Sequence, residues 1–413
     1  MKNILTINTA NAGGGAEKVA YSLCKELHLR GYNSKMLARK IDYGADPLAR
    51  QLVVPVPGDD LVYSAGNFLD ELFSTQYLFY LPTWKIPLMD ITQDADVIHL
   101  HNMHGYYFNL STIPFLMWQK PVVWTFHDMW PFTGKCSHSY ECDRFTSHCG
   151  QCPYLHDYPK LIRDTTRIHL FLKKIFFAKR KFIIVSPSEW LCSKIRQSVV
   201  RDIPCEIIPS PVDTKIFYPE STRLARERLG IPQDKKVVLF IASWVNSIPS
   251  KGLTDFKEML KALYVQRDDV FTLIVGHLEG QSVLKGQFTG KETGWINDPA
   301  MTRSCYSAAD LLVSPTMAEN SSCTIVEAMA CGTPTVAYNS GGVPEQIVHN
   351  ETGYLIQRGD QKSLVNAVQW LLGDDETRTR MHYCASERAR NQYSMELCVE
   401  KYLHAYQEAI RYH

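Results

Sequence analysis

Short apolar runs alternate with amphipathic stretches along the first half of the chain. The run Ile4–Asn8 predicts a buried strand, and Glu17–Gly31 predicts a helix whose residues Val19, Leu23 and Leu27 share one side. Further strands are predicted at Val97–His101, Val122–Phe126 and Phe182–Ser186. Because strands and helices alternate, the pattern indicates parallel β–α–β units and a doubly wound α/β sheet.

A second α/β pattern begins near residue 209. Its predicted strands are Val237–Ala242, Phe271–Val275, Asp310–Val313 and Thr335–Tyr338. A final amphipathic stretch predicts a terminal helix over about Met395–Arg411. Residues 42–95 carry scattered Pro, Gly and aromatic residues and follow neither period, so we interpret them as an insertion.

The composition narrows the class of protein. A chain of 413 residues with 45% apolar residues is long enough for two or three packed domains. The net charge of +1 argues against a nucleic-acid-binding protein, because such binding depends on excess positive charge. The first residues predict a strand and no signal peptide, and no run predicts a transmembrane helix. Apart from four clustered residues, the twelve cysteines are scattered singly, as in a reduced cytoplasmic enzyme.

The stretch from Pro315 to Pro334 carries the clearest functional pattern. We expect Glu319 in a loop and Glu327 in the short helix that follows, with Gly332 as its stop. The residues that favour the helix start are Asn320, Ser321 and Ser322. A helix N-terminus suits a phosphate, and two nearby carboxylates suit hydroxyl groups, so together they indicate a nucleotide-sugar site. The alternative is an ordinary helix with two solvated glutamates.

The flanking residues turn this pattern into a family resemblance. Glu-x7-Glu continues into Glu-Ala-Met-Ala-Cys-Gly-Thr-Pro and then Gly341-Gly342-Val343-Pro344-Glu345, which resembles the donor site of retaining group 1 glycosyltransferases, the GT4 family. The resemblance implies a GT-B fold, in which two Rossmann-like doubly wound domains face a cleft. The domains would be residues 1–208 and 209–394, with residues 395–413 as a helix that crosses back to the first domain. Ile207–Pro219 resembles the interdomain hinge but carries Ser210-Pro211, which stiffens it.

Two motifs of the first domain gain a role from the resemblance. Gly14 and Gly15 follow the first strand and open a helix, so they are either a structural turn or a close approach to the donor phosphates. His127 follows a predicted strand at the carboxyl end of the sheet, where ligands of open α/β sheets bind. A histidine there is often only a structural hydrogen-bonding group, but the family places one against the donor sugar. We expect Asp128 to orient His127 or to brace the loop.

The resemblance also assigns the reacting groups of the second domain. Lys251, just before Gly252, would contact the donor diphosphate, while the arginine that usually helps it has no counterpart in residues 242–246. Lys251 and the helix start around Ser321 and Ser322 would stabilise the leaving diphosphate without a divalent metal. Glu319 would position the sugar hydroxyls and Glu327 would hold the ribose. A solvated surface lysine is the alternative for Lys251.

Four cysteines form a cluster that this chemistry does not use. Cys136, Cys142, Cys149 and Cys152 have the spacing C-x5-C-x6-C-x2-C within an insert over residues 133–153. The C-x2-C end resembles a zinc ribbon, so we expect a structural Zn²⁺, with His138 and His148 as substitute ligands. One or two disulfides and plain buried cysteines are the alternatives. A subset of exopolysaccharide transferases shares this pattern, which implies that the insert shapes the acceptor side.

The segment Arg163–Lys181 is a basic helix with two interpretations. Leu170, Phe171, Ile175 and Phe176 could meet an anionic membrane surface together with Lys173, Lys174, Lys179, Arg180 and Lys181. Alternatively the helix packs on the sheet and exposes only a solvated basic edge.

Together these features predict a cytoplasmic glycosyltransferase, peripheral at the inner membrane face. It would transfer a hexosyl unit from a nucleotide-diphosphate sugar, with retention, to a saccharide or lipid-linked acceptor. The alternatives are a catalytically silent GT-B scaffold and a GT-B sugar-nucleotide epimerase.

Overall fold

The computed structural model describes residues 1–44, 46–244 and 249–413. They fold as two compact units. Unit 1 comprises Met1–Ile208 and Val399–His413, and unit 2 comprises Pro209–Cys398. Within the described residues, no helix combines the length and the apolar composition that a membrane span requires.

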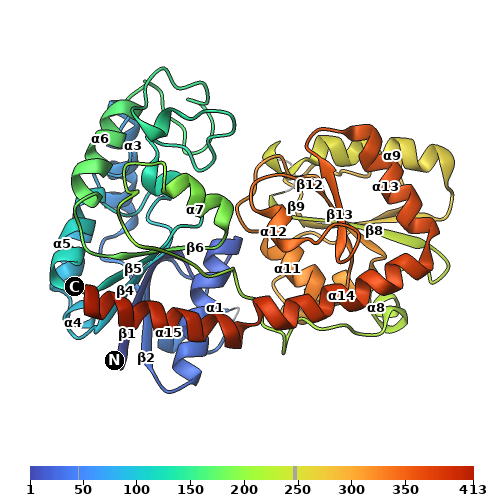
Figure 1. Cartoon of the computed structure of the whole chain (residues 1–413), viewed down its shortest axis with the longest axis horizontal. Coiled ribbons are helices and arrows are strands. Elements are labelled where there is room, and N and C mark those ends of the chain that lie inside the picture. Colours follow the sequence, from blue (N-terminus) through green and yellow to red (C-terminus); the bar gives the residue numbers. More distant parts are fainter. Residues whose placement is uncertain (45, 245–248) are drawn as a thin grey trace. The chain divides into compact units, whose positions relative to one another are not determined.

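Unit 1 is built on a parallel sheet with the order β3-β2-β1-β4-β5-β6-β7 among the described residues (Figure 1). Its strands are β1 (Asn3–Ala10), β2 (Asn33–Lys40), β3 (Val53–Pro55), β4 (Val97–Leu100), β5 (Val122–Thr125), β6 (Ile183–Ser186) and β7 (Cys205–Ile207). Every pairing is parallel. The predicted doubly wound sheet is therefore confirmed, and the short strand β3 shows that residues 42–95 add an edge to it.

The helices of unit 1 connect these strands. They are α1 (Gly15–Leu29), α2 (Ala49–Leu52), α3 (Asp60–Phe73), α4 (Asp90–Gln93), α5 (Ile113–Gln119), α6 (Thr166–Phe177) and α7 (Glu189–Ile195). Short 3₁₀ helices are η1 (Leu81–Leu88), η2 (Leu110–Thr112), η3 (Trp130–Phe132) and η4 (Arg144–Thr146). On α1, the predicted apolar face of Val19, Leu23 and Leu27 is buried.

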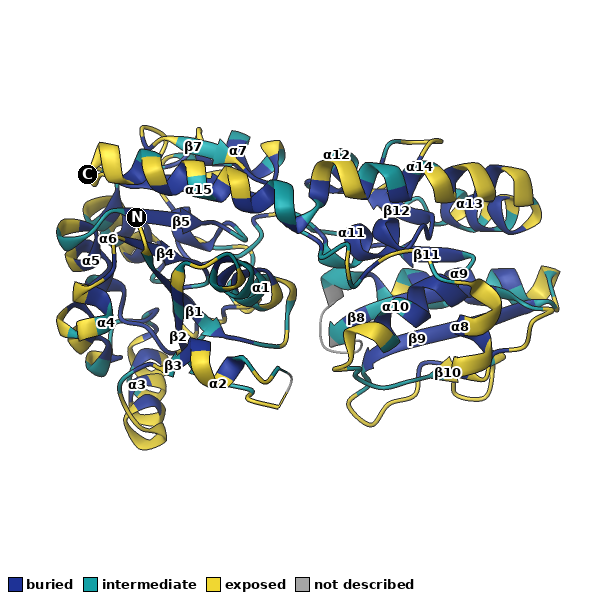
Figure 2. Cartoon of the chain, turned by 90° about the horizontal axis from the view of Figure 1, so that it is seen from below, coloured by how far each residue is buried: buried dark blue, intermediate teal, exposed yellow. Residues whose placement is uncertain are grey.

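Unit 2 repeats this architecture with the sheet order β10-β9-β8-β11-β12-β13 in the part of the chain described. Its strands are β8 (Lys236–Trp244), β9 (Val270–His277), β10 (Gly290–Glu292), β11 (Leu311–Ser314), β12 (Thr335–Asn339) and β13 (Gly353–Gln357). Val237 and Leu239 of β8 join one apolar core, while Val238 and Phe240 join another. Successive side chains of a strand point to opposite faces of the sheet. Since both sets are buried, both faces of this sheet are covered (Figure 2).

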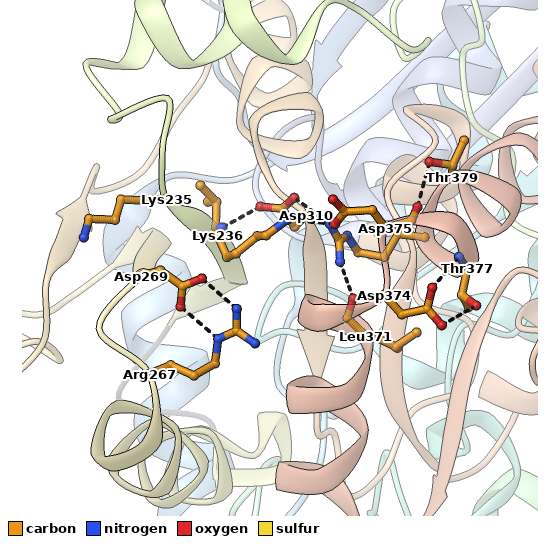
Figure 3. Close-up of polar contacts among 12 residues, drawn as sticks. Lys235, Lys236, Arg267, Asp269, Asp310, Leu371, Asp374, Asp375, Thr377 and Thr379 are labelled. Atoms are coloured by element: carbon orange, nitrogen blue, oxygen red, sulfur yellow. Dashed lines mark hydrogen bonds and ion pairs between the residues drawn. The ribbon is translucent and has the colours of Figure 1, made fainter.

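The helices of unit 2 cover these two faces. They are α8 (Thr222–Leu229), η5 (Pro249–Lys251), α9 (Leu253–Gln266), α10 (Pro299–Ala308), α11 (Cys323–Ala330), α12 (Val343–Gln346), α13 (Gln361–Gly373) and α14 (Asp375–Tyr393). A network of ion pairs lies at the amino-terminal ends of the strands, which we call the amino-terminal edge of the sheet (Figure 3). Asp310, just before β11, accepts from Arg226 of α8 at 2.8 Å and from the Val237 amide at 2.6 Å.

The last helix, α15 (Met395–Tyr412), begins in unit 2 and continues into unit 1. Within unit 1, its buried Tyr406 hydroxyl lies 2.8 Å from Nδ1 of His99, and its Tyr402 hydroxyl lies 3.3 Å from Oγ1 of Thr125. Both partners belong to the central strands of the sheet. The prediction of a terminal helix that returns to the first domain is therefore confirmed.

Candidate functional site

Unit 2 has a candidate site where the strand order of its sheet reverses. The chain leaves β8 toward β9 on one side, while β11 pairs with β8 on the other side, and ligands of open α/β sheets bind at such a switch point. Lys251 follows β8 and Glu319 follows β11, and the Lys251 Nζ lies 2.5 Å from the Glu319 Oε2. Burial works to lower the pKa of Lys251, but the Glu319 carboxylate outweighs it and raises that pKa. The structure thus brings two predicted site residues into one ion pair. The residues 245 and 246 of the stretch without an arginine lie outside the described residues.

Close packing of main chains fixes the loop that carries Glu319. Gly252 has a φ of +76°, and a Cβ there would lie 1.9 Å from the carbonyl oxygen of Pro315. Gly341 has a φ of +57°, and a Cβ there would lie 1.8 Å from the carbonyl oxygen of Glu319. The Gly342 amide donates to the same oxygen at 3.1 Å. Only glycine permits these contacts, so the loops after β8, β11 and β12 are held together around Glu319.

The start of α11 has the geometry of an anion site. Ser322 is its N-cap, as predicted, and its Oγ accepts from the Ile325 amide at 3.4 Å. The Gln346 side chain holds Ser322 from outside, because it accepts from the Ser322 amide and donates to its carbonyl, each at 3.0 Å. The Asn320 amide lies 3.2 Å from Oε1 of Glu319. The Ser321 hydroxyl is buried without a hydrogen-bond partner among the described residues. α11 ends at Ala330, and the predicted stop Gly332 follows with a positive φ.

Glu327 lies inside α11, and sequence analysis missed the residue that holds it. Its carboxylate is buried, and the hydroxyl of the fully buried Tyr306 donates to its Oε2 at 2.8 Å. Tyr306 comes from α10, 21 positions earlier in the chain. The carboxylate is therefore oriented before any ligand arrives. No local sequence signal links these two residues.

Unit 1 has a candidate site of its own, at the switch point between β1 and β4. Gly14 caps α1 and Gly15 begins it, so the amino end of α1 follows the carboxyl end of β1, as predicted. His127 follows β5 and is partly exposed, and its Nε2 lies 2.9 Å from Nδ1 of the buried His101, which follows β4. Burial lowers the pKa of His127 to about 4, so the ring is neutral at pH 7. Sequence analysis did not select His101, although its position after a strand was the available signal.

Asp128 braces the loop that follows His127. Its Oδ2 lies 2.9 Å from Nε2 of His104, and its Oδ1 accepts from the Trp130 amide at 2.8 Å. Burial works to raise the pKa of Asp128, but His104 outweighs it, so that pKa is lowered and the carboxylate stays ionised. Of the two predicted roles, these contacts fit the bracing role.

The cysteine cluster does not support the predicted Zn²⁺ site. Cys136, Cys142, Cys149 and Cys152 line one small pocket, but all four are free thiols. Among the described residues, no group of three or more His, Cys, Asp or Glu side chains is arranged to hold a metal ion. Burial raises the pKa of the Cys149 thiol to about 12. The disulfide alternative has no support either, because these cysteines are unpaired.

The basic segment predicted for membrane contact contains two misassigned residues, Leu170 and Lys173. Leu170 is 3% exposed and belongs to the apolar core of unit 1, so its predicted contact with a membrane is wrong. Lys173 of α6 is fully buried, and its Nζ donates to the carbonyl oxygens of Trp130 at 2.5 Å and Thr133 at 3.0 Å. It also lies 3.8 Å from the centroid of a Trp130 ring, a cation–π contact. Its predicted role at an anionic surface is therefore wrong, because loop carbonyls and an indole ring bind the ammonium inside the unit.

Comparison with known proteins identifies the family. The profile described as Glycosyltransferase Family 4 matches residues 13–216, and the profile described as Glycosyl transferases group 1 matches residues 221–388. The two matches cover both units. The chain belongs to the group 1 (GT4) glycosyltransferases.

Individual relatives of this glycosyltransferase differ in how much of the chain they match. A protein of Escherichia coli (strain K12) described as a colanic acid biosynthesis glycosyl transferase, WcaC, is 24% identical, with 98% of this chain and 99% of that protein covered. The D-inositol 3-phosphate glycosyltransferase of Corynebacterium glutamicum (strain R) is 29% identical over 45% of this chain. The match covers 47% of that relative's length, so the chain spans about half of it.

Solved structures confirm the GT-B-type fold of the glycosyltransferase. Sucrose-phosphate synthase from Thermosynechococcus elongatus has a TM-score of 0.68 at 20% identity, with 99% of both chains covered. WaaG, described as a glycosyltransferase involved in lipopolysaccharide biosynthesis, has a TM-score of 0.69 at 15% identity, with 96% of this chain and 99% of that chain covered.

Proposed function

We propose that this protein transfers a hexosyl unit from a nucleotide-diphosphate sugar to a saccharide or lipid-linked acceptor, with retention of the anomeric configuration. The observation that carries the proposal is the Lys251–Glu319 ion pair beside the capped start of α11, at the switch point of unit 2. A lysine, a set of helix amides and two carboxylates match the diphosphate and the hydroxyl groups of one nucleotide sugar. The relative named for colanic acid biosynthesis supports a polysaccharide as the acceptor.

Donor binding would begin with the opening of the Lys251–Glu319 ion pair. The diphosphate would replace Glu319 at the Lys251 ammonium, and the released carboxylate would accept from the sugar hydroxyls. Lys251 and the amides at the start of α11, near Asn320, Ser321 and Ser322, would stabilise the negative charge that grows on the leaving diphosphate. Glu327, held by Tyr306, would accept from the ribose hydroxyls. These charges allow transfer without a divalent metal.

The residues of unit 1 complete the proposal. Gly14 and Gly15 open α1 and would approach the donor phosphates, and His127 would contact the sugar as a neutral ring. In the transfer, the bond between the anomeric carbon and the diphosphate oxygen breaks. The diphosphate leaves with the electron pair of the broken bond, and a bond from an acceptor oxygen to that carbon forms with the same configuration. The proton of the acceptor hydroxyl passes to the released diphosphate or to water.

A lipid-linked acceptor would place the reaction at the inner, cytoplasmic face of a membrane. The corrected surface of α6 supports such a contact, because Ile168, Phe171 and Ile175 are exposed at helical spacing beside Arg167 and Lys174. We expect liposome flotation to show binding to anionic vesicles that high salt removes. Replacing Phe171 and Ile175 with glutamate should abolish it, and flotation that survives this change would remove α6 from the membrane surface.

The experiment that tests the function is a panel of nucleotide sugars assayed for nucleoside diphosphate release with saccharide and lipid-linked acceptors. UDP-glucose comes first, because a solved structure of Anabaena HepE with this fold contains it. We expect at least one donor to react and NMR of the product to show the donor's anomeric configuration. Donor binding without release of nucleoside diphosphate would favour the silent scaffold. Inverted configuration at a hydroxyl-bearing carbon of the recovered nucleotide sugar would favour the epimerase.

A further inference from the structure

Three histidines of unit 1 form a continuous array in which His99 and His101 are buried and His127 is partly exposed. The rings of His99 and His101 have centroids 4.0 Å apart, and those of His101 and His127 have centroids 5.2 Å apart with planes inclined by 20°. Both ring nitrogens of His99 are hydrogen-bonded to hydroxyl groups. The Tyr406 hydroxyl lies 2.8 Å from Nδ1, and the Thr125 hydroxyl lies 2.8 Å from Nε2. The array therefore runs from α15 to His127.

The contact between His101 and His127 joins two ring nitrogens. Because both rings are neutral, one nitrogen donates its hydrogen and the other accepts it. The direction of donation decides which nitrogen of His127 carries the hydrogen. It also decides the state of the second nitrogen of His101.

Burial of His101 selects one of these two directions. Its Nε2 is buried and has no hydrogen-bond partner among the described residues. If His127 donated, the hydrogen of His101 would sit on this Nε2 and form a buried N–H without an acceptor, which is costly and rare. If His101 donates through Nδ1, its Nε2 carries only an unused lone pair, which costs less.

We propose that His101 is a positioning residue that donates its Nδ1–H to Nε2 of His127 and so fixes His127 as the Nδ1–H tautomer. The inference rests on the proposed function, in which His127 contacts the donor sugar. With Nε2 engaged, His127 offers a hydrogen-bond donor through Nδ1 and does not act as a base. The groups it would recognise are oxygens of the sugar that can accept a hydrogen bond, such as a hydroxyl or the ring oxygen.

The tautomer can be read directly without any nucleotide sugar. The test is a long-range ¹H–¹⁵N correlation spectrum of wild-type protein labelled with ¹⁵N-histidine at pH 7, with signals assigned by comparison with a His127→Gln variant. We expect protonated Nδ1 and unprotonated Nε2 for His127. A protonated Nε2 on His127 would overturn the proposal.

Kinetics of two His101 variants test the positioning role. In His101→Asn, the side-chain amide can still donate from near the position of Nδ1, whereas His101→Leu fills the space without a donor. We expect His101→Leu to lower kcat by roughly 10- to 100-fold with a smaller change in KM. We expect His101→Asn to keep most of the wild-type kcat. The matched control is His169→Leu, because His169 is buried in the same unit and its ring nitrogens have no partner among the described residues.

The two proposals fail in distinguishable ways. Equal kcat for His101→Leu and wild type would overturn the positioning role, and if His101→Leu does not fold, the wild-type spectrum and His101→Asn still decide. Absence of turnover with every nucleotide sugar would reject the proposed function, while an Nδ1–H signal for His127 would leave the donation from His101 standing.

Discussion

In the unit 2 sheet, charged side chains of the same kinds serve different purposes at the two ends of the strands. These ends are the amino-terminal edge and the carboxyl edge. At the amino-terminal edge, Asp310 accepts from the Arg226 guanidinium and the Val237 amide, and its Oδ1 lies 3.7 Å from Nη2 of Arg378. At the carboxyl edge, Lys251 pairs with Glu319 in loops that pack closely against one another through Gly252 and Gly341. The first arrangement joins three elements of the fold, whereas the second joins two loops at a switch point.

This difference separates stability from function. A carboxylate that neutralises buried arginines cannot be released without leaving buried charge, so it serves the fold. A pair whose lysine side chain is 36% exposed can exchange its carboxylate for a ligand that also carries negative charge. Replacing residues at the two edges should therefore change different measurements.

The largest effect is expected at the carboxyl edge. Glu319→Gln removes the carboxylate that accepts from the sugar, so kcat should fall by about 10²- to 10³-fold. The affinity for nucleoside diphosphate and the melting temperature should change little. The checks are steady-state kinetics, calorimetric titration and thermal unfolding, and full activity of this variant would refute the role of Glu319.

Asp310→Ala should produce the opposite pattern. It leaves Arg226 and the Val237 amide without their shared acceptor, so the free energy of unfolding should fall by about 3 kcal/mol. The kcat of the molecules that remain folded should stay at the wild-type value. Urea unfolding gives the stability, and a variant that is stable but inactive would break the comparison between the edges.

A smaller effect is expected for Tyr306→Phe, which removes one hydroxyl and little volume. Glu327 loses the donor that orients it, which should weaken donor binding by about 1 kcal/mol, or roughly fivefold. Calorimetric titration measures the change. Unaltered donor affinity would show that Tyr306 does not prepare Glu327 for the ribose.

Metal removal should have the smallest effect. If Lys251 and the start of α11 bear the diphosphate charge, EDTA should leave kcat unchanged within about twofold. A strict requirement for Mg²⁺ or Mn²⁺, restored when the ion is added back, would mean that protein groups alone do not neutralise the diphosphate.

The sequence was sufficient for features that depend on local patterns. Apolar runs located the central strands of both sheets, and the residues around Ser322 and Gly332 located α11, because strand burial and helix caps are local. Contacts between distant residues were not predictable. Tyr306 reaches Glu327 from another helix, and His101 meets His127 across two neighbouring strands.

The same limit explains the corrections to the basic segment and to the cysteine cluster. Lys173 looked like part of a basic surface, since nothing in its own helix shows that loop carbonyls and Trp130 surround it. The cysteine spacing suggested a metal, but spacing alone does not determine whether the thiols converge in a ligand geometry.

The most direct test of the account compares two lysines at opposite ends of β8. Lys236 begins the strand and pairs with Asp375, and Lys251 follows its carboxyl end. Calorimetric titration of the reactive nucleotide sugar onto Lys251→Met and Lys236→Met should show affinity lowered at least about tenfold in the first variant and unchanged in the second. Equal affinity in the two variants would contradict the assignment of the donor diphosphate to the carboxyl edge of unit 2.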